Sequence, residues 1–300
     1  MILTGVLLAV AVGLLWNAGG IVNSICARKK FDICTYLLTN VLFSAFLTGS
    51  IVASSGVGVF RRENVIFIAV VMLAGVFNTS GALFMQRALQ LCHHGIVFLI
   101  SQAAPVIPFV AGMLFLGDTP TVKKIGGVML ILLGMFLSAL PELRMREASN
   151  AVSIKKGLLC ALFTFGCFGI SHTLLALPSL MDLAPGIEKF RAYFIYCGSS
   201  CLILTVVGIR GRTQKLSLDR RLLVTGVIVG TINVCSMWIF FKAMDFLASA
   251  KAVGLGSPLA TSASLIGFTL YSWFYLREKR YPAAVCGLVC IAAGAVAASL

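Results

Sequence analysis

The sequence predicts an all-α integral membrane protein with ten transmembrane helices, arranged as two inverted five-helix repeats. Composition is the first reason. Of the 300 residues, 59% are hydrophobic and 11% are charged, whereas about 25% of the residues of a soluble domain are charged. The apolar residues also form continuous runs of about 20 residues, the length of a helix that crosses a bilayer. Finally, the second half of the chain repeats residues of the first half at fixed offsets.

The first half contains five runs that are long enough to span a membrane. They cover residues 2–26, 35–55, 65–89, 95–116 and 125–140. Basic clusters such as Arg28-Lys29-Lys30 and turns such as Gly117-Asp118-Thr119-Pro120 separate the runs. The first run has no basic segment before it and contains Trp16, so we expect a membrane helix there rather than a signal peptide.

The second half contains five further runs, at residues 157–177, 190–209, 222–246, 253–276 and 283–300. The longest polar connection, residues 141–156, lies between the two sets of runs. We therefore expect two homologous repeats, 1–148 and 149–300. Because each repeat has an odd number of helices, the second must cross the bilayer in the opposite direction to the first.

The matched positions of the internal repeat include polar as well as apolar residues. At an offset of 155 residues Asn78 matches Asn233 and Arg87 matches Lys242. At an offset of 160, Leu116 matches Leu276, Asp118 matches Glu278, Gly127 matches Gly287, Gly134 matches Gly294 and Leu140 matches Leu300; at 152, Trp16 matches Phe168. In a membrane protein such halves indicate a transporter with its substrate site between them.

The cations and cysteines exclude several other classes of protein. The formal net charge is +14, but the cations lie in short clusters between the apolar runs, as membrane-flanking residues do. We therefore expect a lipid bilayer, and not nucleic acid, as a partner. The cysteine pairs Cys197/Cys201 and Cys286/Cys290 favour close helix packing over a metal site. No cofactor is expected, and no P-loop pattern indicates ATP-driven pumping.

The loops carry information on orientation. Lys and Arg are more frequent in the loops that follow the odd-numbered runs. The positive-inside rule therefore predicts that these loops are cytoplasmic and that both termini lie outside. The short turn Cys92-His93-His94 is expected to lie at the membrane interface.

Several motifs together resemble a known family. The pattern Ala88-Leu89, Pro105-Val106, Leu116-Gly117-Asp118, Gly127 and Gly134 resembles the EamA-type repeat of the drug/metabolite transporter superfamily, and Leu14-Leu15-Trp16-Asn17 resembles the opening of that repeat. Asp118 replaces the usual Glu and Asn17 the usual Gly. In the second half Leu265 stands where the proline of the repeat would fall, and Pro258 lies seven residues earlier.

The resemblance implies a ten-helix bundle of inverted five-helix repeats in the cytoplasmic membrane. It also implies a central substrate cavity, lined mainly by the first four helices of each half, and transport of a small metabolite. Finally, it implies cytoplasmic termini, the opposite of what the distribution of Lys and Arg predicts, so the orientation stays open.

Seven residues are candidates for the cavity wall: Trp16, Asn17, Asn78, Gln102, Asn233, Ser236 and Trp238. The amides of Asn78 and Asn233 lie in mid-helix, where an unpaired amide is costly, and the repeat could place them face to face. An aromatic wall with a few amides suits an apolar or zwitterionic metabolite. The alternatives are interhelical hydrogen bonds for the amides and packing in the core or against lipid for the tryptophans.

Four charged or titratable residues are candidates for a gate: Arg87, His172, Lys242 and Asp245. Lys242 and Asp245 are three residues apart and can meet on one helix face, although snorkelling to the interface is the alternative for the charged groups. His172 could be linked to protons. Pro105 and Pro258 mark candidate helix breaks, whose freed carbonyl groups a substrate could satisfy, or plain packing kinks.

None of the ten carboxylates lies clearly in mid-membrane. The carboxylate relay of proton-driven carriers is therefore missing, which favours facilitated diffusion or exchange of a small-molecule substrate. A lipid flippase and a non-transporting membrane subunit are the alternatives. An enzyme is not indicated, because no convergent set of acid, base or metal ligands is found. The Gly-rich fifth and tenth helices are expected to support packing or a homodimer.

Overall fold

The computed structural model describes residues 1–28, 32–54, 64–91, 97, 100–144, 151–183, 185–210, 220–275, 277 and 281–299. These residues form helices and turns and no strand, which confirms the prediction of an all-α protein. Several predicted features lie outside the described residues: Lys29-Lys30, Cys92-His93-His94, Leu276, Glu278, Leu300 and the repeat boundary after residue 148.

The helices follow the predicted runs closely. In the first half they are α1 (Ile2–Arg28), α2 (Ile33–Ala53), α3 (Val65–Leu91), the shorter α5 (Val106–Phe115) and α6 (Val122–Arg144). In the second half they are α7 (Ala151–Ala176), α8 (Arg191–Arg210), α9 (Arg220–Ser249), α10 (Gly256–Phe274) and α11 (Pro282–Ser299). Three 3-10 turns adjoin α7, α8 and α10: η2 (Leu177–Ser179), η3 (Ile187–Phe190) and η4 (Val253–Leu255).

The lengths and outer surface of the helices fit a bilayer. Within the described residues, eight helices are long and apolar enough to cross a membrane, and Ile100–Phe115 is a shorter apolar segment. Large apolar side chains such as Leu7, Phe46, Ile66 and Leu162 are exposed on the outside of the bundle. So much exposed apolar surface is unusual for a soluble monomer and is stable when it contacts lipid. The chain is therefore a multi-pass integral membrane protein.

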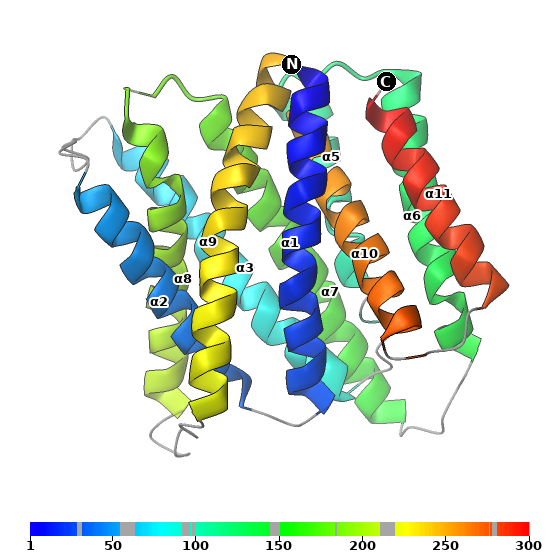
Figure 1. Cartoon of the computed structure of the whole chain (residues 1–300), viewed down its shortest axis with the longest axis horizontal. Coiled ribbons are helices and arrows are strands. Elements are labelled where there is room, and N and C mark those ends of the chain that lie inside the picture. The colour runs from blue at the N-terminus through cyan, green and yellow to red at the C-terminus, as the bar shows by residue number, and fades with distance from the viewer. Residues whose placement is uncertain are drawn as a thin grey trace.

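The two halves of the chain interlock in the bundle (Figure 1). α1 packs on α9 and α10, α2 on α8 and α9, and α3 on α7 and α8, while α6 packs on α11. Both termini lie at the same end of the bundle, at the top of Figure 1. We refer to this end as the terminal end and to the opposite end as the distal end.

Glycines bring α6 and α11 into close contact. A Cβ atom added at Gly134 would lie 2.5 Å from the carbonyl oxygen of Gly287 and 2.8 Å from the backbone nitrogen of Ile291. One added at Gly127 would lie 2.5 Å from the backbone nitrogen of Ala298. Small residues allow such approach in lipid, which is the packing role predicted for these two helices. Because the glycine faces are used within the chain, a homodimer would have to use other faces of α6 and α11.

Candidate functional site

A cavity of about 260 Å³ lies between the helices of the two halves. Its wall is formed by α1, α2, α3, α7, α8, α9 and α10 and by residues just before α5. The lining reaches Tyr36, in the first turn of α2, and Met85, near the end of α3. Both positions are at the distal end of their helices (Figure 1), so the cavity extends from the middle of the bundle toward the distal end.

Six residues predicted from the sequence line this cavity: Trp16, Asn78, Gln102, Pro105, His172 and Asn233. The two asparagines share the cavity, but they are not bonded to each other. Asn233 Nδ2 donates to Asn40 Oδ1 on α2 over 3.4 Å. The Asn78 amide makes no hydrogen bond to the described residues, so it is available to a solute.

Three rings meet at the part of the wall formed by α1, α7 and α9. The ring centroid of Trp16 is 5.6 Å from that of His172 and 5.2 Å from that of Phe240. His172 Nδ1 lies 3.2 Å from the hydroxyl of Ser257 at the start of α10. This hydrogen bond fixes the imidazole beside the Trp16 ring.

The helix break predicted at Pro105 is present, and it lies at the cavity wall. Helical structure ends at Gln102, residues 103–105 form a turn, and α5 begins at Val106. Ser101, Gln102 and Pro105 all line the cavity. Pro258, in contrast, lies in the first turn of α10, where the N–H groups have no intrahelical partner. Pro258 therefore starts a helix and does not break one.

Three other wall candidates lie away from the cavity. Trp238 is 39% exposed on the outside of α9, because it follows Met237 by one residue, about 100° around the helix. Ser236 is buried and donates to the backbone carbonyl of Asn233 over 2.8 Å. Asn17 packs against α10 at Gly267, where an added Cβ atom would lie 2.8 Å from Asn17 Nδ2.

The repeat-matched cations Arg87 and Lys242 are both exposed, near the ends of α3 and α9. Arg87 Nη1 lies 3.3 Å from Gln90 Oε1. Asp245 pairs with Arg191 of α8, with 2.6 Å between Nη1 and Oδ1, and not with Lys242 as the sequence suggested. The physical reason is burial: the exposed ammonium of Lys242 can be solvated, whereas the buried guanidinium of Arg191 needs a carboxylate.

Six further polar residues line the cavity without having been predicted: Tyr36, Asn40, Ser101, Tyr196, Thr261 and Ser264. Spacing could have found two of them, because Tyr36 and Asn40 are four residues apart and share one face of a helix. Ser101 is adjacent to the predicted Gln102. Thr261 and Ser264 follow Pro258 in a helix rich in small hydroxyl residues, where nothing in the pattern separates wall from packing positions.

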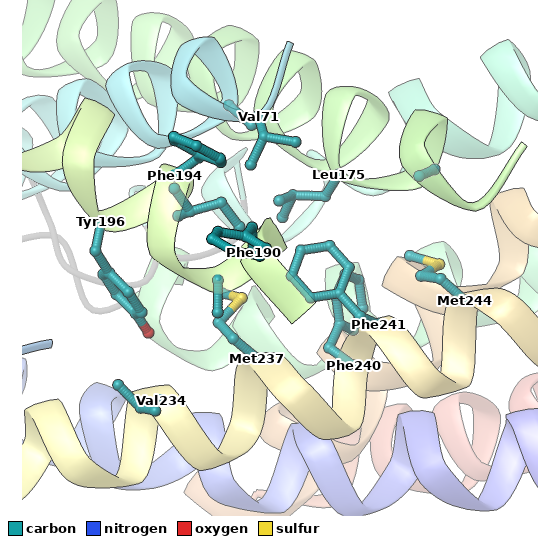
Figure 2. Close-up of a cluster of buried hydrophobic side chains, with 14 of the residues drawn as sticks. Val71, Leu175, Phe190, Phe194, Tyr196, Val234, Met237, Phe240, Phe241 and Met244 are labelled. Atoms are coloured by element: carbon teal, nitrogen blue, oxygen red, sulfur yellow. The ribbon is translucent and has the colours of Figure 1, made fainter. Parts of the chain in front are cut away.

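A buried apolar cluster closes the space between the cavity and the terminal end (Figure 2). Along α9, Asn233 and Met237 line the cavity, Phe240, Phe241 and Met244 belong to the cluster, and Asp245 follows. Figure 2 shows Met237, Phe240 and Phe241 of α9 facing Phe190 of η3, Phe194 of α8 and Leu175 of α7. The order along α8 is the reverse, from Arg191 through Phe194 to Tyr196.

Arg191 ties the terminal end of this cluster together. The residue is 5% exposed. Besides its ion pair with Asp245, its Nη2 donates to the carbonyl oxygen of Pro178 over 3.1 Å, and its guanidinium carbon lies 5.4 Å from the Phe241 ring centroid. A buried cation with a carboxylate, a carbonyl and an aromatic partner connects η2, α8 and α9. The sequence predicts a helix at residues 190–209 but does not indicate this role for Arg191 at its start.

Asp118 makes a second connection between the halves. It is buried, and its Oδ1 and Oδ2 accept hydrogen bonds from the backbone N–H groups of Val253 (2.9 Å) and Gly254 (2.7 Å) in η4. η4 leads directly into α10, the helix that carries Thr261 and Ser264. A carboxylate is favourable at the N-terminal end of a helix, so Asp118 fixes the start of a helix that lines the cavity.

The fold and the cavity define a class: a multi-pass helical membrane protein whose two halves enclose a polar site. Residues 3–140 match the model of the EamA-like transporter family. This match covers the first half of the chain and agrees with the resemblance to the drug/metabolite transporter superfamily that the motifs indicated; the matched family is one of transporters and not of enzymes.

A comparison with solved structures finds the same fold over the whole chain. One, described only as "Crystal structure of protein", superposes with a TM-score of 0.71 at 16% identity, covering 99% of this chain and 98% of that one. At this identity the likeness concerns the fold alone. No curated protein matches the sequence.

Proposed function

We propose that this protein is a secondary transporter of a small organic metabolite across the cytoplasmic membrane, working by alternating access at the cavity between the two halves. The observation that carries the proposal is the composition of the cavity wall, to which both halves contribute. In transporters built from inverted repeats the substrate site lies near the midplane at the repeat interface, and rocking of one half against the other exposes it to each side.

The proposal includes ten spanning helices in two inverted repeats, 1–148 and 149–300, and matched hydrogen bonds support it. The Ser199 hydroxyl lies 3.0 Å from the carbonyl oxygen of Gly75, and that of Ser44 lies 3.3 Å from the carbonyl oxygen of Gly230. The two pairs are related by the offset of 155 residues that also relates Asn78 to Asn233. Each bond joins the second helix of one half to the third helix of the other.

The helix packing and one backbone conformation agree with this symmetry. The contact of α1 with α9 corresponds to that of α7 with α3, and the contact of α2 with α9 to that of α8 with α3. Gly117 and Arg277, which are 160 residues apart, are both left-handed, with φ of 76° and 54°. A left-handed backbone is unusual for a residue other than glycine, so the match at Arg277 points to a shared turn.

The cavity wall repeats in the same way. Several pairs of lining positions are related by the offsets of 155 or 160 residues, among them Asn78 and Asn233, Ala82 and Met237, and Ser101 and Thr261. A wall drawn from seven helices favours a solute carrier over a lipid flippase, which needs a slot open to the lipid between two helices. No observation favours a non-transporting subunit.

No Asp or Glu is present among the described residues that line the cavity. A proton-driven carrier normally uses intramembrane carboxylates. The proposal is therefore facilitated diffusion or exchange of a small-molecule substrate, with no carboxylate relay.

The test is counterflow into proteoliposomes, with a mixed metabolite pool outside and mass spectrometry as the readout, with and without a pH gradient. Enrichment of one solute regardless of the gradient supports the proposal. Enrichment only with a gradient contradicts the uncoupled mechanism. No enrichment by folded protein contradicts transport altogether.

A single substitution tests the site. Asn78→Leu removes an amide that has no partner within the described protein, so the fold loses no hydrogen bond while a solute loses one. A buried hydrogen bond left unmade costs about 1–3 kcal/mol, which corresponds to a roughly 5–150-fold rise in the half-saturating solute concentration. Counterflow with solute titration measures this rise. The lipid-facing Trp238→Phe is the control, and transport unchanged in Asn78→Leu would show that the amide does not bind solute.

A further inference from the structure

The polar side chains of the cavity wall carry no formal charge. They are amides, hydroxyls and one imidazole, and no Lys, Arg, Asp or Glu occurs among the described residues that line it. An ion transferred from water into such a site loses its hydration and gains no counter-charge. Arg191 and Asp245, at the terminal end of the apolar cluster, form an ion pair with each other. The wall therefore suits an uncharged solute.

Several polar groups of the wall lack a partner. The hydroxyl oxygen of Ser101, a residue that is 3% exposed, is buried and makes no hydrogen bond within the described protein. Buried polar groups normally have partners, so the Ser101 hydroxyl, like the Asn78 amide, is a group that a solute would satisfy.

The remainder of the wall is apolar and partly aromatic. Trp16 and Phe168, which occupy matching positions of the two repeats, both line the cavity, and the Trp16 ring is held by His172 and Phe240. The volume of about 260 Å³ is room for about nine water-sized groups. A solute that fits has flat apolar faces, a polar edge and the size of one or two fused rings.

We propose that the cavity selects an uncharged planar heterocycle with adjacent hydrogen-bond donors and acceptors on its edge, the chemical class of free nucleobases and related cyclic amides. Asn and Gln side chains offer a donor and an acceptor side by side and bind such edges in a bidentate manner. Asn78 and Gln102 supply these amides, Ser101 supplies a hydroxyl, and Trp16 supplies an aromatic face. The inference rests on the proposed function, because it assumes that the cavity is the transport site.

The test is uptake of labelled adenine and uracil into proteoliposomes. The comparison solutes are glucose (neutral but not planar), phenylalanine (zwitterionic), benzoate (anionic) and tetramethylammonium (cationic). Saturable uptake of a base, inhibited by the other base and not by the four comparison solutes, is the expected result. Transport of a comparison solute in place of the bases overturns the inference and leaves the carrier function standing. Absence of base uptake overturns it too, and the mixed-pool counterflow then decides whether the carrier function also fails.

Two variants locate the selectivity. Ser101→Ala removes a hydroxyl that bonds to nothing in the described protein, so the melting temperature should stay unchanged while the KM for the base rises at least threefold. Asn78→Leu should raise the KM for the base further. Asn78→Gln should raise it less than Asn78→Leu does, because it keeps the amide. Trp238→Phe is the control. A KM for the base that stays unchanged in both Ser101→Ala and Asn78→Leu contradicts the assignment.

Discussion

Single polar residues inside the membrane divide into two groups. Asn233 and His172 are bonded to side chains of other helices, which is the structural use of polar side chains in lipid. Asn78, Gln102 and Ser101 line the cavity and have no bonded partner among the described residues. The difference in hydrogen-bond partners, which cannot be read from the sequence, separates the residues proposed to bind solute from those that support the bundle.

Replacing the Asp118 carboxylate should lower the stability of the protein. Asp118→Leu leaves the buried N–H groups of Val253 and Gly254 without acceptors, at about 1–3 kcal/mol for each group. We expect a clearly lower melting temperature in detergent and lower transport, because α10 loses its fixed start. Asp182→Asn, at an exposed carboxylate, is the matched control and should melt as the wild type does. Equal melting of Asp118→Leu and wild type would contradict this role.

At the residue scale, the sequence predicts the identity of several cavity residues but not their surroundings. Asn78 and Asn233 could be chosen because the repeat pairs them, and both line the cavity. The sequence could not exclude Trp238 from the cavity wall. A helix that is hydrophobic on all sides has no periodic pattern to show which face points into the bundle. Arg191 was missed for a related reason: a cation at a predicted helix end is normally solvated.

At the scale of helix pairs, the close contact between α6 and α11 gives a prediction about stability. Gly134→Ala places a Cβ atom 2.5 Å from the carbonyl oxygen of Gly287, so the helices must separate, at a cost of about 1–3 kcal/mol. Gly126 lies on the same helix with no atom within 4 Å of an added Cβ. Gly126→Ala should therefore be neutral or stabilising by about 0.5–1 kcal/mol. Thermal unfolding in detergent compares the two, and a Gly134→Ala protein as stable as Gly126→Ala would contradict the packing.

The terminal-end closure formed by α7, α8 and α9 gives another prediction. Asp245→Asn leaves the Arg191 guanidinium without its carboxylate, which we expect to weaken the closed state by about 1–2 kcal/mol and raise opening roughly 5–30-fold. The measurement is the rate at which an impermeant maleimide, added at the terminal end, modifies a Met237→Cys protein. Lys242→Gln removes a neighbouring exposed charge and should leave this rate unchanged. Equal rates in both variants would show that the ion pair does not hold the closure.

At the element scale, the sequence predicts the structure well. The apolar runs predicted most of the helices to within about six residues at each end, because bilayer thickness fixes both their length and their composition. The exception is the run at 95–116, where α5 covers only Val106–Phe115. Pro105 predicted a break that is present, whereas Pro258 begins α10. A proline lacks a backbone N–H both where it starts a helix and where it interrupts one. The sequence alone therefore does not distinguish the two cases, and the conformation of the neighbouring backbone does.

At the scale of the whole molecule, the main feature is how the two halves correspond and pack together. The repeat in the sequence indicated which residues correspond, and the packing of α1 on α9 and α3 on α7 agrees with that correspondence. The sequence could not indicate that the cavity extends toward the distal end while an apolar cluster fills the terminal end. That asymmetry belongs to one conformation, and an alternating-access carrier must have a second one with the opposite opening.

Side-specific labelling of the cavity tests this account most directly. Ala82→Cys places a thiol on the wall, and Leu73→Cys places one on the lipid-facing side of the same helix, in a background in which the ten native cysteines are replaced by serine or alanine. An impermeant maleimide is added to either side of sealed vesicles. Alternating access at this cavity predicts that Ala82→Cys reacts from both sides, more slowly when transported solute is present, and that Leu73→Cys reacts from neither. Reaction of Ala82→Cys from one side only, with or without solute, would contradict alternating access at this cavity.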